Sequence, residues 1–127
     1  MSSEAVAPPR EWRLFVMAVP VDRPLSERER EVVELFVATA FVGAESVAES
    51  LQRLRVSGAC DCGCPTVYFD PDQSGLVVAA EASVAGTNDS VLVFVNARGC
   101  LSSLEYVWID PPPAEFPSPA ALAVLAR

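Results

Sequence analysis

From Ser26 onward, the pattern of apolar and polar positions changes its period near Val56. Before this point, apolar residues recur at the three- and four-residue spacing of a helix. After it, the pattern has the period of two that is typical of strands. Helices followed by hairpin-connected strands favour an α+β fold. We therefore expect a helical hairpin packed on one face of an antiparallel sheet of about four strands.

Two helices are predicted before the change of period. Ser26 and Glu29 form the Ser-x-x-Glu pattern of a capping box, which predicts a helix over 27–41. Gly43 is expected to end this helix. A second helix is predicted over 45–55, with one apolar face. The short link between the two predicts that they pack as a hairpin.

Four strands are predicted after the change, separated by turns rich in Gly, Asn, Asp and Pro. They cover residues 66–69, 76–84, 90–96 and 101–109. The third of these is apolar on both faces, which indicates a central strand. Prolines from Pro111 onward prevent any continuation of the fourth. Ser118 and Pro119 then predict a last short helix that runs through Leu125.

The chain of 127 residues is expected to form a single domain over 25–127. Residues 1–24 are predicted to be an N-terminal extension or an edge strand. In the second interpretation Trp12 to Val19 forms the strand, and Pro20 and Pro24 end it. Residues 1–16 are expected to be dispensable for folding.

The distribution of apolar residues indicates a cytoplasmic protein. The longest uncharged apolar stretch, Leu35 to Ala44, is too short to span a bilayer. The N-terminus has neither the basic start nor the apolar centre of a signal peptide. We therefore expect a soluble protein, although the sequence defines no oligomeric state.

The charge is acidic and uneven, with a net charge of −8. Residues 56–126 carry eight acidic residues and only one basic residue, Arg98. Phosphate backbones and anionic membranes repel such a surface, so neither nucleic acid nor a membrane is an expected partner. An acidic half could attract a basic protein. Alternatively, the surplus acid only keeps an apolar domain soluble.

The sequence contains no histidine and no lysine, which disfavours an enzyme. A Ser-His-Asp triad and Schiff-base chemistry are both excluded. The enzymatic alternative depends on Glu105, which could be a perturbed acid in a pocket. A carboxylate at this position could equally lie on the solvent side of an edge strand.

Three of the four cysteines alternate in a short run, Cys60, Cys62 and Cys64. An extended run would place the three thiols on one side, with neighbouring Cα atoms about 7 Å apart. A turn at Gly63 would bring them closer. Three interpretations are open: small packed hydrophobes, a thiolate site for Zn²⁺ with Cys100 as a fourth ligand, or redox chemistry.

The cysteine run resembles a motif in a family of small actinobacterial proteins of unknown function. In that family, residues corresponding to 58–66 commonly read Gly-Arg-Cys-Gly-Cys-Gly-Cys-Pro-Ser/Thr. The similarity covers about residues 25–119, including Phe41-Val42-Gly43-Ala44-Glu45 and the Pro-Pro-Ala-Glu-Phe-Pro run at 112–117. This chain differs at Ala59 and Asp61, and Cys100 is not a family position. The resemblance implies a common origin but no activity. It also implies that at most three cysteines, Cys60, Cys62 and Cys64, are metal ligands in the family.

A non-catalytic protein-interaction module, of the immunity or accessory type, is the function that these patterns favour. Its grounds are the missing catalytic residues, the acidic sheet half and the side chains of the last strand. Glu105, Tyr106 and Trp108 are the predicted interaction residues. The alternative is a thiolate metal-binding or redox protein that uses the three cysteines. No cofactor is expected under the first function, whereas Zn²⁺ is expected under the second.

Overall fold

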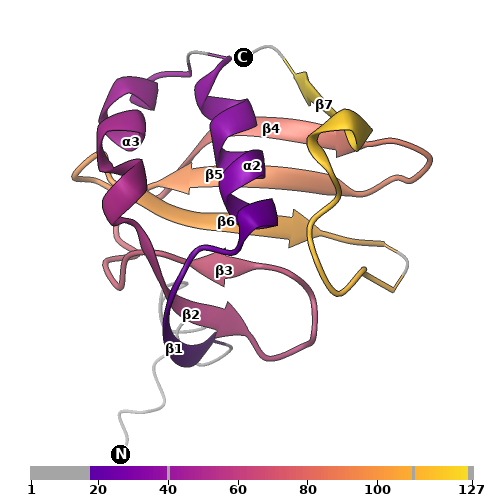
Figure 1. Cartoon of the computed structure of the whole chain (residues 1–127), viewed down its shortest axis with the longest axis horizontal. Helices are drawn as coiled ribbons and strands as arrows, with labels where there is room; N and C mark the ends of the chain where they lie inside the picture. Colours follow the sequence, from indigo (N-terminus) through magenta and orange to yellow (C-terminus); the bar gives the residue numbers. More distant parts are fainter. Residues whose placement is uncertain (1–17, 40, 110, 126–127) are drawn as a thin grey trace, which may run out of the picture.

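A computed structural model describes residues 18–39, 41–109 and 111–125. Most of the predicted first strand, residues 12–17, lies outside the described residues, as do residues 1–16, which were expected to be dispensable. Two short α-helices lie on one face of a single sheet (Figure 1). None of the described helices is long and apolar enough to cross a membrane.

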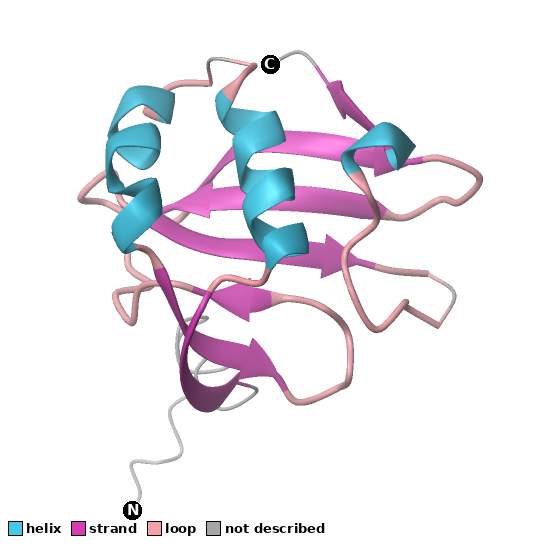
Figure 2. Ribbon diagram, viewed as in Figure 1, coloured by secondary structure: helices cyan, strands magenta, loops and turns pink. Residues whose placement is uncertain are grey.

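All paired strands in the sheet are antiparallel, and their order is β1-β2-β3-β6-β5-β4-β7 (Figure 2). The α+β class and the antiparallel sheet are thus confirmed, but the sheet has seven strands rather than about four. The strand expected to be central, β5, lies between β4 and β6. The strands are β1 Ala18–Pro24, β2 Arg55–Cys60, β3 Val67–Tyr68, β4 Val77–Val84, β5 Ser90–Val95, β6 Leu101–Val107 and β7 Leu122–Leu125.

The three strands that the sequence did not delimit lie toward the two edges of the sheet. Strand β1 continues through Pro20 and ends at Pro24, because an edge strand can leave proline without a ladder hydrogen bond. The predicted C-terminal helix was wrong beyond Ala121. Leu122 and Val124 pack on the core, and the residues that alternate with them are exposed. This is the pattern of a strand, and the segment pairs with β4.

Both helices are shorter than predicted. Helix α2 spans Glu27–Val37, and α3 spans Ala44–Ser50 before one 3₁₀ turn, Leu51–Arg53. Helix α2 ends early because the hydroxyl of Thr39 donates a 2.6 Å hydrogen bond to the carbonyl of Phe36. The predicted long hairpin is therefore replaced by two short helices beside each other on the sheet.

The core lies between these helices and the sheet. Fully buried side chains of α2, among them Phe36, contact a row of residues that runs across the strands. The row consists of side chains directly opposite one another in the ladders, Val67, Leu104, Val93 and Ala80. Residues that alternate with this row point to the opposite face of the sheet.

The start of α2 is fixed by a network around Glu29. Its amide donates to the Ser26 hydroxyl, and its carboxylate accepts from the Ser26 amide at 2.8 Å, as the capping-box pattern predicts. Both carboxylate oxygens also accept from the Arg23 guanidinium at 2.9 Å. Burial raises the pKa of Glu29, but Arg23 and Ser26 together outweigh it and hold this pKa below its ordinary value.

We expect Glu29→Gln to lower the free energy of unfolding by about 1 kcal/mol at neutral pH. The value is modest because solvent screens the partly exposed Arg23. A lowered folded-state pKa stabilises the fold above the unfolded-state pKa, and this contribution is lost as the pH falls through the folded-state value. The difference from the native chain should therefore shrink in acid, as measured by urea unfolding at several pH values. Glu34→Gln, on the exposed side of α2, should change little, and equal effects of the two variants would contradict the role of Glu29.

Candidate metal centre

The cysteine run forms the turn between β2 and β3. Strand β2 ends at Cys60, whose amide donates to the carbonyl of Thr66 at 3.1 Å and closes the turn. Gly63 has φ +95°, which is a conformation that favours glycine. The run is thus not extended, and the chain reverses direction within it.

This turn brings the three thiols together. The Sγ atoms of Cys60, Cys62 and Cys64 all lie within 4.8 Å of one another. Cys60 and Cys62 are the pair in contact, at 2.9 Å between sulfurs. The amide of Cys64 donates to the Cys62 sulfur at 3.4 Å. Cys62 is exposed and the other two are half-buried, so these thiols do not fill the core as the packing interpretation expected.

The cluster distributes its protons unevenly. Burial, followed by the contact with Cys62, raises the pKa of the Cys60 thiol to about 12. The pKa of the Cys62 thiol is lowered, because Cys60 and Cys64 donate hydrogen bonds that stabilise its thiolate. Of Cys60 and Cys62, Cys62 is therefore the one that loses its proton more readily.

Tyr68 and Glu105 lie near the cluster, on the face of the sheet opposite the helices. The ladders place Tyr68 beside Ser103 and Gly58, so that Cys60, two residues further on, shares this face. Burial raises the pKa of the Tyr68 hydroxyl, and negative charge on Glu105 and on the thiols raises it further. Tyr68 was not a predicted site residue, and only the β2–β3 register identifies it.

Glu105 is half-buried on a central strand, so its interpretation as the solvent side of an edge strand was wrong. Burial raises the pKa of the Glu105 carboxyl. The Ser103 hydroxyl donates a 3.0 Å hydrogen bond to this carboxylate and lowers the pKa, but burial has the larger effect. The raised pKa agrees with the perturbed acid that the sequence left open, whereas its position in a pocket stays a prediction.

Cys100 lies away from the cluster. It follows the turn between β5 and β6, where its amide donates to the side chain of Asn96 at 3.1 Å. There it lines a cavity of about 360 Å³ together with Arg98 and residues of α3. The structure thus brings three of the four predicted metal ligands together and separates the fourth.

The three predicted interaction residues do not form one surface. Tyr106 is buried against Phe116, and its hydroxyl donates to Asp89 at 2.7 Å. Glu105 points to the other face of the sheet, because it is adjacent to Tyr106 on the same strand. Trp108 follows the end of β6 and is 43% exposed.

The donor set of the cluster suits a soft metal ion. Tetrahedral Zn²⁺ with Zn–S bonds of about 2.3 Å requires sulfurs about 3.8 Å apart. One sulfur pair is closer than this, at 2.9 Å, and no pair is further apart than 4.8 Å. The three cysteines could therefore hold a metal ion after small side-chain rotations.

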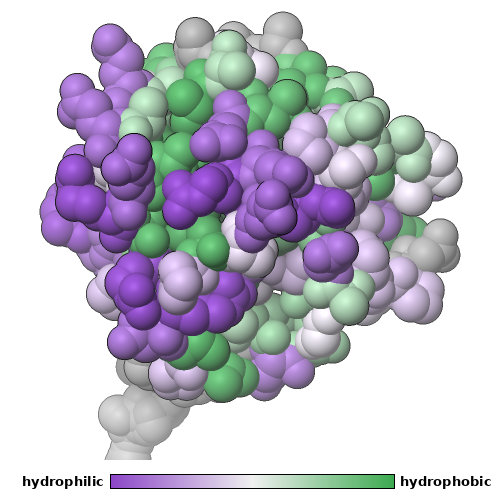
Figure 3. Space-filling model, viewed as in Figure 1, coloured by the Kyte–Doolittle hydropathy of each residue, from purple (hydrophilic) through white to green (hydrophobic). Residues whose placement is uncertain are grey.

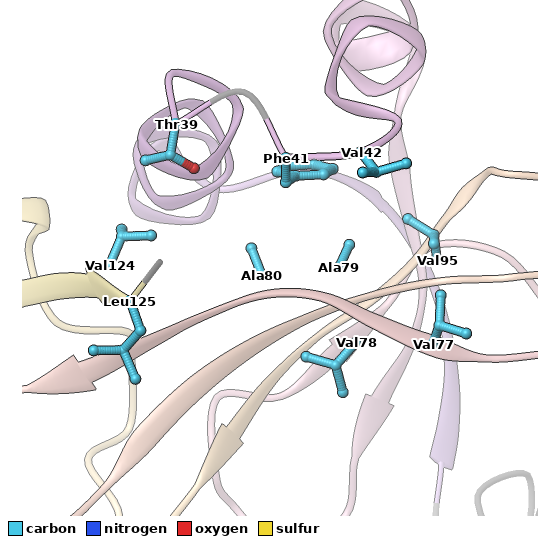
Figure 4. Close-up of a pocket in the computed structure, with 10 residues that line it drawn as sticks. All are labelled: Thr39, Phe41, Val42, Val77, Val78, Ala79, Ala80, Val95, Val124 and Leu125. Carbon is cyan, nitrogen blue, oxygen red and sulfur yellow. The ribbon is translucent and has the colours of Figure 1, made fainter. Parts of the chain in front are cut away.

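A second cavity, of about 600 Å³, lies between the α2–α3 link and strands β4 and β7 (Figure 4). Phe41 and Val42 line it on the side of the link, and Ala79 and Ala80 line the opposite side. Its described lining contains no titratable side chain and a single hydroxyl, that of Thr39. Apart from this hydroxyl, the described side chains of the lining offer only apolar contact.

No protein-family model, no curated protein and no solved structure matches the chain. The resemblance to the actinobacterial family therefore stays a prediction, and the function has to be argued from the site itself.

Proposed function

We propose that this chain is a thiolate metal-binding protein in which Cys60, Cys62 and Cys64 hold one Zn²⁺ ion. The observation that carries the proposal is the convergence of three Sγ atoms on one turn, within 4.8 Å. Thiolate, rather than thiol, is the form that ligates a metal. The lowered pKa of the Cys62 thiol makes its thiolate easier to form than that of an ordinary cysteine, which favours binding.

The exposure of the turn also supports binding rather than packing. A cysteine kept as a small hydrophobe is usually buried, whereas Cys62 is exposed to solvent. The Cys64 amide stabilises charge on the Cys62 sulfur, as hydrogen bonds to ligand sulfurs do in metal sites. Gly63 permits the reversal that makes the sulfurs converge.

Three protein ligands leave the fourth position of a tetrahedral ion open. Structural zinc sites use four protein ligands, whereas sites with three bind water or an external ligand as well. Cys100 is held in another turn, so we infer that the fourth ligand comes from outside the cysteine cluster. This arrangement suits an exchangeable ion better than a permanently enclosed one.

Cobalt substitution tests this function directly. Titrating the reduced full chain with Co²⁺ should give thiolate-to-cobalt charge-transfer bands that saturate at one ion per chain. Zn²⁺ should remove these bands by displacement. A variant with all three cysteines replaced by serine should show none of them, while Cys100→Ser should behave as the native chain does. Weak spectra without thiolate bands in the native chain would refute the proposal.

A second candidate function, the binding of a basic protein, is favoured by the positions of the exposed acids. Among the described acids of residues 56–126, only Asp61 and Glu115 are exposed. Asp70 and Asp72 instead pair with Arg98 at 2.7 and 3.0 Å. Apart from Asp61, the exposed acids outside any ion pair that the structure describes lie on the helices, at Glu27, Glu34, Glu45 and Glu49. Figure 3 shows hydrophilic side chains gathered over α2 and α3.

If the helices bind a basic partner, affinity for an arginine-rich peptide should fall steeply as salt is added. Exposed charges are screened over about 10 Å at 0.1 M salt and over about 3 Å at 1 M. Neutralising the four helix acids to glutamine should abolish most of this salt dependence, as measured by fluorescence anisotropy. The matched control is Asp61→Asn with Glu115→Gln, which should leave it unchanged. Salt-insensitive binding would contradict this second function.

A further inference from the structure

The closest contact in the cysteine cluster is between Cys60 and Cys62, whose sulfurs are 2.9 Å apart. We propose that these two cysteines are a peroxide-sensitive dithiol, and that their oxidation to a disulfide releases the metal ion. The release step rests on the proposed function, whereas the disulfide step depends only on the pair itself. The proposal adds redox control to the site.

The geometry selects this pair among the three cysteines. A disulfide requires sulfurs about 2.05 Å apart, so the Cys60 and Cys62 sulfurs have to approach by about 0.9 Å. Cys60 is fixed at the end of β2 by its hydrogen bond to Thr66. Cys62 lies in the turn and is exposed, so no surrounding core packs against its side chain. Cys62 is therefore the partner that can approach a fixed Cys60.

Exposure determines the order of the chemistry. Cys62 is exposed and can meet a dissolved peroxide, whereas Cys60 is half-buried behind it. The Cys62 sulfur attacks the peroxide, an S–O bond forms, the O–O bond breaks and hydroxide leaves. The proton of the Cys62 thiol converts this hydroxide to water.

The half-buried thiol then completes the reaction. The Cys60 sulfur attacks the sulfenic sulfur of Cys62, an S–S bond forms, the S–O bond breaks and water leaves with the Cys60 proton. In total, two thiols and one hydrogen peroxide give one disulfide and two waters, and two electrons pass from sulfur to oxygen. In the loaded protein Cys60 and Cys62 have lost their protons on binding, so the two protons that complete the waters come from solvent. A metal ion held by all three thiolates would then retain only Cys64 and would dissociate.

The test treats the full chain with hydrogen peroxide, both metal-free and loaded with Zn²⁺. Peptide mapping by mass spectrometry without reductant identifies the disulfide, and a chromophoric chelator measures the zinc released. We expect a Cys60–Cys62 disulfide in the native chain, in Cys64→Ser and in Cys100→Ser. Cys60→Ser should instead accumulate a sulfenic acid at Cys62, trapped by dimedone. In the loaded protein, one zinc should be released for each disulfide formed.

The two proposals fail in different ways. If the chain binds no zinc but forms the disulfide when metal-free, the proposed function fails and the dithiol stands. If zinc binds and peroxide leaves both thiols reduced, the metal site stands and the dithiol proposal is overturned. Two further results in the native chain would overturn the dithiol proposal. One is a disulfide between Cys62 and Cys64, and the other is oxidation of Cys62 without any disulfide.

Discussion

Cys64→Ser is expected to weaken zinc binding by about 100-fold or more. Substitutions that only touch the groups around a ligand already cost roughly 10- to 100-fold in affinity, so the loss of one of three ligands should cost at least as much. The half-buried sulfur of Cys64 lies within 4.8 Å of both other sulfurs, so a bound ion would contact all three. Competition with a chromophoric chelator measures the affinity of each variant.

Cys100→Ser is the matched control for this experiment. It removes one thiol of similar exposure from a turn outside the cluster, and it should leave the zinc affinity within about twofold of the native value. If Cys64→Ser and Cys100→Ser lost equal zinc affinity, the site would not consist of Cys60, Cys62 and Cys64 alone. Circular dichroism of both variants checks that the fold is retained.

Phe36→Ala is expected to lower the free energy of unfolding by about 3–5 kcal/mol, the range for truncating a fully buried aromatic side chain. Phe36 is fully buried and joins α2 to the row of sheet residues that includes Leu104. The matched control is Val42→Ala, since Val42 is 93% exposed and should change stability by no more than about 0.5 kcal/mol. Urea unfolding measures both. A loss below 1 kcal/mol for Phe36→Ala would contradict the position of the core between helices and sheet.

The sequence predicted best those elements whose boundaries depend on local interactions. The Ser26 and Glu29 capping box is present as expected, because its hydrogen bonds join residues three positions apart. The strand-prone runs between turn residues also predicted the positions of β4, β5 and β6. These signals are local, so they survive without knowledge of the tertiary structure.

Elements that depend on distant partners were missed or mistaken. Strand β7 consists of only four residues, and its pairing with β4 decides its conformation. Strand β2 contains Gly58 and Cys60, which weaken a strand pattern, yet it is held between β1 and β3. Both strands are stabilised by neighbours that are remote in the sequence, and local propensity does not contain this information.

The candidate site was predictable in composition but not in geometry. The alternating cysteines indicated a thiol cluster, and Gly63 indicated a turn that could close it. The separation of Cys100 from this cluster follows from the position of the β5–β6 turn, which needs the sheet order. The distribution of acidic residues also could not be interpreted without the fold. Asp70 and Asp72 counted toward the surplus of negative charge, but the fold pairs both with Arg98.

The metal content of the native protein tests the central claim most directly. The full chain should be purified under reducing conditions without added metal or chelator, and its metals and free thiols should be counted together. We predict one zinc per chain, lost in the variant with Cys60, Cys62 and Cys64 replaced by serine and kept in Cys100→Ser. Native protein that holds no zinc, and that takes up none when the ion is supplied, would contradict a thiolate metal centre in this turn.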